Sequence, residues 1–195
     1  MYRFPIGGAA TLLALVLAFP LPAHATQWVF DPSVLVADSR TLLLRAPDHE
    51  IDRLLQAVHG SAQSPTEAAA LCAAFDPNGE LGLEALQTAG EQLAPASRER
   101  FVAAITSVVI AAAQHQPQPF DETQARQALK AAGVSAAIQH DGFSAGLNGT
   151  DRDARCRSVG QLIDGLQAQP LPNRAAATRL LLMEGISMIA PTLQP

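Results

Sequence analysis

Apolar residues recur along most of the chain at the three- and four-residue spacing that places them on one face of a helix. From residue 47 onward, a helix start signal, an apolar stretch and a Gly or Pro stop follow one another repeatedly. The segment Ser64-Pro65-Thr66-Glu67 is a capping box with Pro at the first helical position. The helices expected from these signals cover residues 47–60, 64–75, 83–94, 96–115, 121–133, 150–169 and 173–189.

Three segments are less regular. The segment from Gln27 to Arg45 has short apolar runs that fit a small extended hairpin or a helix, and we favour a helix over 33–44. A further short helix is expected over 136–140, and residues 141–149, with three glycines, are expected to form the main loop. The pattern predicts an all-α fold, an irregular bundle of about six to eight helices with a possible short extended N-terminal segment.

The stretch from Ala96 to His115 is the longest helix candidate. Its apolar positions are Phe101, Ile105, Val108, Val109 and Ala112, and it has no charged residue after Arg100. A helix that is apolar on all sides belongs in a protein interior. We therefore expect a buried central helix.

The first 25 residues have the layout of a secretory signal peptide. Arg3 precedes an apolar run over residues 9–19, and Ala23-His24-Ala25 supplies the small residues that signal peptidase requires. A membrane-spanning helix needs roughly 20 apolar residues, and this run is much shorter. We therefore expect residues 1–25 to be removed by cleavage before Thr26.

Cleavage would leave residues 26–195 as a single helical domain, exported to the periplasm or out of the cell. Because Arg3 is lost, 12 basic and 18 acidic residues remain, and the net charge changes from −5 to −6. An acidic chain is a poor partner for nucleic acid. No Cys lies near the cleavage site to accept a lipid, so we expect no stable membrane insertion of the mature chain.

The chain contains two cysteines, Cys72 and Cys156. In an oxidising compartment, a pair with no competitors forms one disulfide, and its connectivity is then unique. A bond between these positions would close a long loop and stabilise the fold by about 4 kcal/mol in the chain-entropy model. Two buried free thiols are the alternative, because Cys is often buried.

Only one segment matches a catalytic motif. Residues 142–146, Gly-Phe-Ser-Ala-Gly, fit the nucleophile-elbow pattern G-x-S-x-G around Ser144. That motif requires a buried strand before the serine and a histidine after it, whereas no histidine follows His140. His140 and Asp141 adjoin the segment, so a small exported hydrolase that uses His140, Asp141 and Ser144 is the alternative to a non-enzymatic protein.

No cofactor or metal is expected. The histidines lack ligand-type neighbours at metal spacing. Residues 76–79, Asp-Pro-Asn-Gly, place Gly fourth, whereas a calcium loop needs it sixth, and so predict a turn.

A dense group of charges begins the helix that carries Cys156. The group comprises Asp151, Arg152, Asp153, Arg155 and Arg157. It is either a contact surface for a partner protein or a solvated helix start, with its acids near the positive end of the helix dipole. Thr150 with Asp153 is expected to cap this helix.

Glu184 is a single acid within the apolar segment 180–186. It is expected at the edge of the buried face, near Arg174 and Thr178, or in a buried pair with an arginine.

Without a complete catalytic motif, we favour an exported, non-enzymatic helical protein that binds another protein, as an inhibitor, immunity protein or adaptor does. Such a protein needs an exposed apolar or charged patch large enough for an interface. The hydrolase alternative needs His140, Asp141 and Ser144 to converge beside a pocket. Binding of a small apolar ligand inside the bundle would instead need an unfilled cavity.

Overall fold

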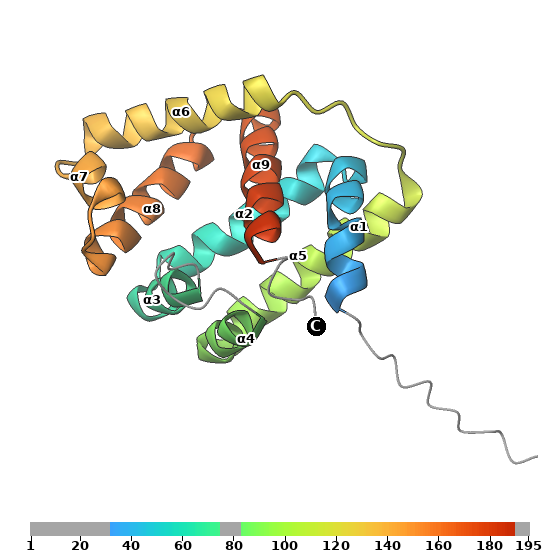
Figure 1. Cartoon of the computed structure of the whole chain (residues 1–195), viewed down its shortest axis with the longest axis horizontal. Helices are drawn as coiled ribbons and strands as arrows, with labels where there is room; N and C mark the ends of the chain where they lie inside the picture. Colours follow the sequence, from blue (N-terminus) through green and yellow to red (C-terminus); the bar gives the residue numbers. More distant parts are fainter. Residues whose placement is uncertain (1–31, 75–82, 190–195) are drawn as a thin grey trace, which may run out of the picture. The chain divides into compact units, whose positions relative to one another are not determined.

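A computed structural model of the protein describes residues 32–74 and 83–189, and over these residues the chain forms nine α-helices and no strand (Figure 1). In chain order they are α1 (Pro32–Arg45), α2 (Asp48–Ala62), α3 (Pro65–Ala74), α4 (Leu83–Gln92), α5 (Pro95–Gln114), α6 (Glu122–Gln139), α7 (Phe143–Asn148), α8 (Arg152–Gln167) and α9 (Leu171–Ile189). The expected all-α bundle is confirmed. The predicted signal peptide, residues 26–31 and the turn at 76–79 lie outside the described residues.

Helix α1 confirms the helical interpretation of residues 33–44. Helix α2 begins directly after Pro47 and α3 begins at Pro65, as the start signals predict. Helix α5 begins at Pro95, one residue before its predicted start. Local chemistry therefore places most of the helix starts correctly.

Gly133 does not end a helix, contrary to the prediction. Helix α6 continues through it to Gln139 and includes the short helix expected over 136–140. Asp121 caps its start as predicted, because the carboxylate accepts hydrogen bonds from the backbone N–H groups of Thr123 and Gln124 at 2.8 and 3.1 Å. The buried alanines of α6 pack on α8 and α9, and this burial outweighs the cost of about 1 kcal/mol for a mid-helix glycine.

The loop expected over 141–149 contains a short helix, α7. Gly142 precedes it with a φ of 81°, in the left-handed region that glycine adopts without strain. Phe143 is buried directly after this turn, and the Ser158 hydroxyl on α8 donates to its carbonyl oxygen at 3.0 Å. Burial of one aromatic ring thus folds a segment whose glycines suggest a loop.

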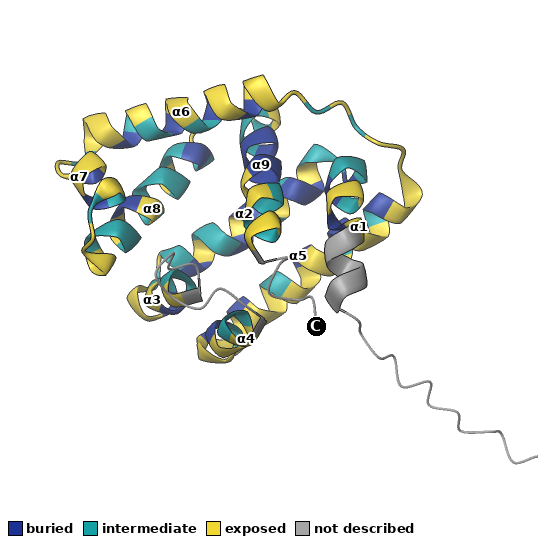
Figure 2. Ribbon diagram, viewed as in Figure 1, coloured by how far each residue is buried: buried dark blue, intermediate teal, exposed yellow. Residues whose placement is uncertain are grey.

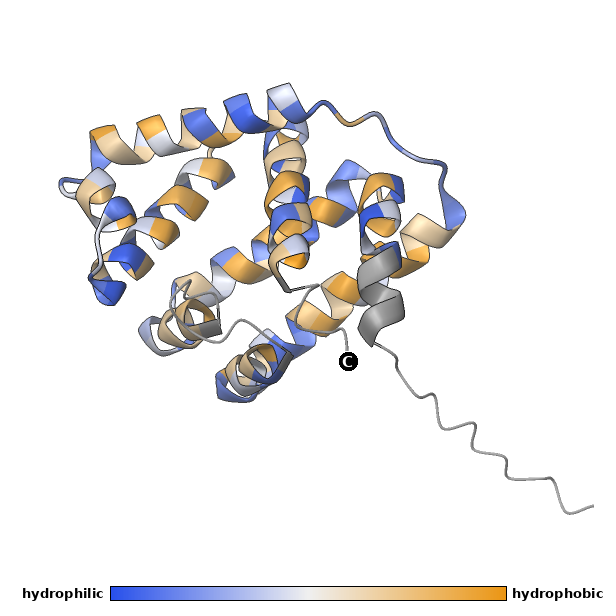
Figure 3. Cartoon of the chain, viewed as in Figure 1, coloured by the Kyte–Doolittle hydropathy of each residue, from blue (hydrophilic) through white to orange (hydrophobic). Residues whose placement is uncertain are grey.

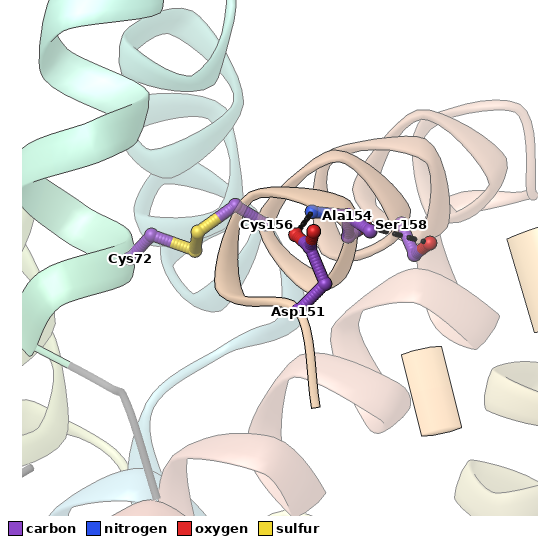
Figure 4. The surroundings of a disulfide bond; sticks show 5 residues. All are labelled: Cys72, Asp151, Ala154, Cys156 and Ser158. Atoms are coloured by element: carbon purple, nitrogen blue, oxygen red, sulfur yellow. Dashed lines mark hydrogen bonds between the residues drawn. A yellow bond between two sulfur atoms is a disulfide. The ribbon is translucent and has the colours of Figure 1, made fainter. Parts of the chain in front are cut away.

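The cap of α8 is Asp151 rather than the predicted Thr150. Its carboxylate accepts a hydrogen bond from the backbone N–H of Ala154 at 2.8 Å (Figure 4). Thr150 is exposed, one residue too early to cap the helix.

The predicted disulfide is present. Cys72 on α3 and Cys156 on α8 are bonded to one another, with their Cα atoms 5.7 Å apart (Figure 4). The bond joins two helices that are far apart in the sequence.

Two helices, α2 and α9, contribute to both of the larger apolar clusters. One cluster lies where they meet α1 and α5, and the other lies where they meet α6 and α8. The buried positions of α2 and α9 are visible in Figure 2. Most of the buried apolar residues are alanines, so the helix backbones can approach closely.

The α6–α8 contact shows how close this approach is. A Cβ atom placed on Gly165 of α8 would lie 2.7 Å from the carbonyl oxygen of Ala132 on α6. Only glycine fits there. Gly160, on the same helix, has no heavy atom within 4 Å of its Cβ position.

We expect Gly165→Ala to lower the free energy of unfolding by about 1–3 kcal/mol, because the added methyl group must force α6 and α8 apart. Gly160→Ala is the matched control, and it should leave stability unchanged or raise it by about 0.5–1 kcal/mol. Urea titrations followed by circular dichroism measure both. Equal effects of the two substitutions would contradict the close contact.

A buried arginine, Arg179 on α9, joins α9 to the link between α1 and α2. Its guanidinium donates to the carbonyl oxygens of Leu43 and Ala46, at 3.0 and 2.6 Å, and to Asp48 Oδ1 at 2.6 Å. The side chain is only 3% exposed. The residue four positions after Leu43 is Pro47, which has no N–H, so the Leu43 carbonyl needs a donor from elsewhere.

We expect Arg179→Met to lower the free energy of unfolding by roughly 2–5 kcal/mol, because it leaves two buried carbonyl groups without donors, at about 1–3 kcal/mol each. Arg157→Met, on the exposed side of α8, should change stability by less than about 0.5 kcal/mol. Thermal and urea unfolding of both variants test this. A loss below about 1 kcal/mol for Arg179→Met would show that water can replace the guanidinium.

Candidate functional site

The residues of the hydrolase hypothesis do not form an assembled site. Ser144 and Asp141 are exposed, and His140 is half-buried at the end of α6. No hydrogen bond or ion pair joins these three side chains in the described structure, and the segment before Ser144 is a helix end and a turn rather than a strand. The convergence that a catalytic triad requires is therefore missing.

Within residues 32–74 and 83–189, no group of three His, Cys, Asp or Glu side chains is placed to hold a metal ion. In the same part of the chain, none of the helices has the length and apolar character needed to cross a bilayer.

The charged group at the start of α8 is partly used in folding. Asp151 caps the helix, and the Arg155 guanidinium donates to the carbonyl oxygen of Gly149 at 2.8 Å. Asp153 and Arg157 are exposed. A role of this group as a contact surface stays a prediction.

Glu184 lies in a surface ion pair rather than a buried one. Its carboxylate is 3.0 Å from Arg126 on α6, and both side chains are about half exposed. Arg126 also pairs with Glu122 at 2.8 Å. Arg174, expected near Glu184, instead pairs with Asp52 on α2. Of the two surface pairs of Arg126, the one with Glu184 links α9 to α6.

Helix α5 is not buried on all sides, contrary to the prediction from its composition. Its main neighbours are α1 and α2, and only the stripe of Ser97, Ala104, Val108 and Ala112 is buried. Its other side exposes β-branched residues: Val102 (63%), Ile105 (53%), Val109 (40%) and Ile110 (54%). Figure 2 shows exposed positions along α5, and Figure 3 shows hydrophobic residues along the same helix.

We call the exposed positions Val102, Ile105, Thr106, Val109 and Ile110 the α5 outer face. The sequence between Phe101 and Gln114 has no charged residue. Exposed single apolar residues are normal in proteins, whereas a continuous group of them on one helix makes this face a candidate interaction site.

An open hollow adjoins the N-terminal end of the α5 outer face. It has a volume of about 380 Å³ and is lined by Pro95, Arg98, Glu99, Val102 and Ala103. All the charged residues of α5 lie at this same end of the helix.

A carboxylate on α3 accepts hydrogen bonds from residues at the start of α5. Glu67 is buried, and its Oε1 accepts hydrogen bonds from the Ser97 hydroxyl at 2.9 Å and from the Ala94 backbone N–H at 3.3 Å. The hydrogen bond from Ser97 is the main cause that lowers the pKa of Glu67 below its ordinary value of 4.5. The Ser61 hydroxyl also lowers this pKa, although Ser61 Oγ and Glu67 Oε2 do not meet in good hydrogen-bond geometry.

Hydrogen bonds from α2 and α1 also fix the middle and the end of α5. The Ser107 hydroxyl donates to Glu50 on α2 at 2.5 Å. The Arg45 guanidinium on α1 donates to the carbonyl oxygen of His115 at 2.8 Å. Because polar contacts fix three points along α5, its outer face has a defined orientation.

Sequence reasoning missed this face. The sequence shows the apolar residues of α5, but it does not show how many helices pack against α5. A comparison of the chain with protein-family models, with curated proteins and with solved structures finds no significant match, so the geometry alone supports a function.

Replacing Glu67 with Gln tests whether its carboxylate stabilises the start of α5. A charged acceptor makes stronger hydrogen bonds than a neutral amide, so we expect Glu67→Gln to lower the free energy of unfolding at pH 7 by about 1–2 kcal/mol. Because folding lowers the pKa of Glu67, its stabilisation is full above about pH 4.5 and is lost as the pH falls through the folded-state pKa. The difference between the wild type and Glu67→Gln should therefore shrink in acid.

Urea titrations between about pH 3 and pH 7 measure this difference. The exposed Glu99 on α5 provides the control, since Glu99→Gln should change stability by less than about 0.5 kcal/mol at pH 7. A difference between the wild type and Glu67→Gln that stays constant over this pH range would contradict the assignment.

Proposed function

We propose that this chain is an exported, non-enzymatic protein that acts by binding protein, as an inhibitor, immunity protein or adaptor does, and that the α5 outer face is its contact surface. The observation that carries the proposal is the exposure of four β-branched side chains, Val102, Ile105, Val109 and Ile110, on a helix with no charge between Phe101 and Gln114.

The energetics of this face favour binding. Full burial of a Val or Ile side chain contributes about 1.5–3 kcal/mol. β-branched side chains have few rotamers in a helix, so they lose little entropy when a partner covers them. The face also has no charge that a partner would have to desolvate.

Two observations support export. The first 25 residues have the pattern of a signal peptide, and the disulfide between Cys72 and Cys156 suits an oxidising compartment. In such a compartment the protein would meet other exported proteins.

A photo-crosslinking side chain introduced at Val109 tests the proposal in the exported fraction of the producing cell. We expect a discrete crosslinked species that contains a second protein chain. The same probe at Val134, an exposed apolar position on α6, is the matched control and should give no such species.

The captured chain, once purified, should bind the wild type and the Val134→Asp variant equally. Val109→Asp should weaken binding by at least tenfold, because the new carboxylate must be desolvated in the interface. The proposal fails if positions 109 and 134 capture the same chains, or if Val109→Asp binds as well as the wild type.

A further inference from the structure

We propose that the disulfide between Cys72 and Cys156 is a redox latch, which a dithiol reductant opens in the folded protein. Once the bond is open, α3 and α4 lose their ordered packing, while α6 and α9 stay folded. The inference rests on the proposed function, because the latch then regulates the α5 outer face through the start of α5.

Helices α3 and α4 lie outside the apolar core. The apolar clusters are built from α1, α2, α5, α6, α8, α9 and adjoining residues, and no described residue of α3 or α4 belongs to them. Within these two helices, the buried apolar residues that the structure describes are Ala70 and Ala89, whereas Leu71 and Leu86 are half-buried. Because an alanine side chain has little apolar surface to bury, the hydrophobic effect stabilises this pair of helices only weakly.

The attachment of this pair to the bundle depends on α3. Helix α4 packs chiefly against α3, and α3 in turn contacts α2 and α8 (Figure 1). The disulfide adds a covalent bond from α3 to α8. Helix α8 is itself well packed, because its Leu166 lies in the cluster with Leu55 of α2. The bond therefore joins a weakly packed pair of helices to a firmly packed helix, and its loss should affect the weakly packed pair first.

The bond is accessible in the folded protein. Cys72 and Cys156 point toward one another from α3 and α8, and both residues are only half-buried (Figure 4). A disulfide that a thiolate can reach is open to exchange, whereas a disulfide inside a core is reduced only after unfolding.

Reduction transfers two electrons from a dithiol to the bond. One thiolate of the dithiol attacks one sulfur of the bond, forms a mixed disulfide with that cysteine and releases the other cysteine as a thiolate. The second thiol of the dithiol, once deprotonated, displaces the first cysteine from the mixed disulfide. The dithiol ends as a disulfide, and the two cysteine thiolates take up the two protons that it loses. A protein with an exposed Cys-x-x-Cys dithiol belongs to the chemical class that carries out this exchange.

Helix α3 connects the latch to α5. Glu67 on α3 accepts the hydrogen bonds of the Ser97 hydroxyl and the Ala94 backbone N–H, which fix the start of α5. Arg98 and Val102, which line the hollow beside the α5 outer face, lie within the next two turns. When α3 loosens, these turns lose their carboxylate acceptor. A partner would then meet a less ordered surface and would have to order it on binding.

The first experiment treats the purified protein with dithiothreitol, a small dithiol, at neutral pH and without denaturant. Alkylation followed by intact mass measurement counts the free thiols. The bond should open within about tenfold of its rate in the urea-unfolded chain, because it is accessible in the folded protein. A bond that opens only as fast as the chain unfolds would overturn the latch.

The second experiment compares backbone hydrogen exchange in the oxidised and the reduced protein. On reduction, the amides of α3 and α4 should exchange at least about tenfold faster, whereas those of α6 and α9 should change by less than about twofold. The double variant Cys72→Ala/Cys156→Ala is the matched control. It should exchange as the reduced wild type does, with or without dithiothreitol.

The third experiment measures binding of the chain that a photoprobe at Val109 captures. Reduction should weaken binding to the wild type by at least about tenfold, because fewer molecules keep a binding-competent start of α5. Dithiothreitol should not change binding to the double variant, and this comparison separates the latch from any effect of the reductant on the partner.

Equal exchange of α3 and α4 in both redox states, or faster exchange along the whole chain on reduction, would overturn the latch and leave the proposed function standing. Equal binding in both redox states, with exchange as expected, would overturn the regulation of α5. If position 109 captures no chain, the proposed function fails, and the exchange measurement alone then decides the latch.

Discussion

The packing of this protein depends on the buried guanidinium of Arg179. Helix α1 ends at Arg45, two residues before Pro47, which cannot donate a hydrogen bond to the Leu43 carbonyl, and Arg179 on α9 supplies that donor. The same side chain binds Ala46 and Asp48, so one residue fixes the end of α1 and the start of α2 against α9. A buried arginine is costly unless its N–H groups are satisfied, and here both carbonyls and a carboxylate satisfy them.

With the link between α1 and α2 fixed, α2 and α9 are shared between the two larger apolar clusters. Alanines and Gly165 let the neighbouring backbones come close, so the helices around α2 and α9 bury much of their apolar surface with small side chains. Helix α5 packs mainly on α1 and α2, and its larger side chains therefore stay outside.

Features set by adjacent residues could be predicted from the sequence. The Asp121 cap and the proline starts of α2 and α3 are examples. The disulfide could also be predicted, although its cysteines are far apart in the sequence, because the chain has no third cysteine. Other features set by distant residues could not. Helix α6 continues through Gly133 because α8 and α9 pack against it. Helix α7 forms because the Phe143 side chain is buried. Helix α5 is half exposed because few helices pack against it. A periodic apolar pattern predicts which face of a helix is buried, but it does not predict how many other helices pack against that helix.

An apolar helix at the edge of a fold could in principle roll about its axis to hide its exposed side chains. Helix α5 cannot do so without loss, because Glu67 holds its first turn, Glu50 holds Ser107 and Arg45 holds its last carbonyl groups. Each of these contacts fixes the rotation of the helix as well as its position. The polar contacts on the inner side therefore keep Val109 and its neighbours facing outward, where the proposed partner would remove them from water.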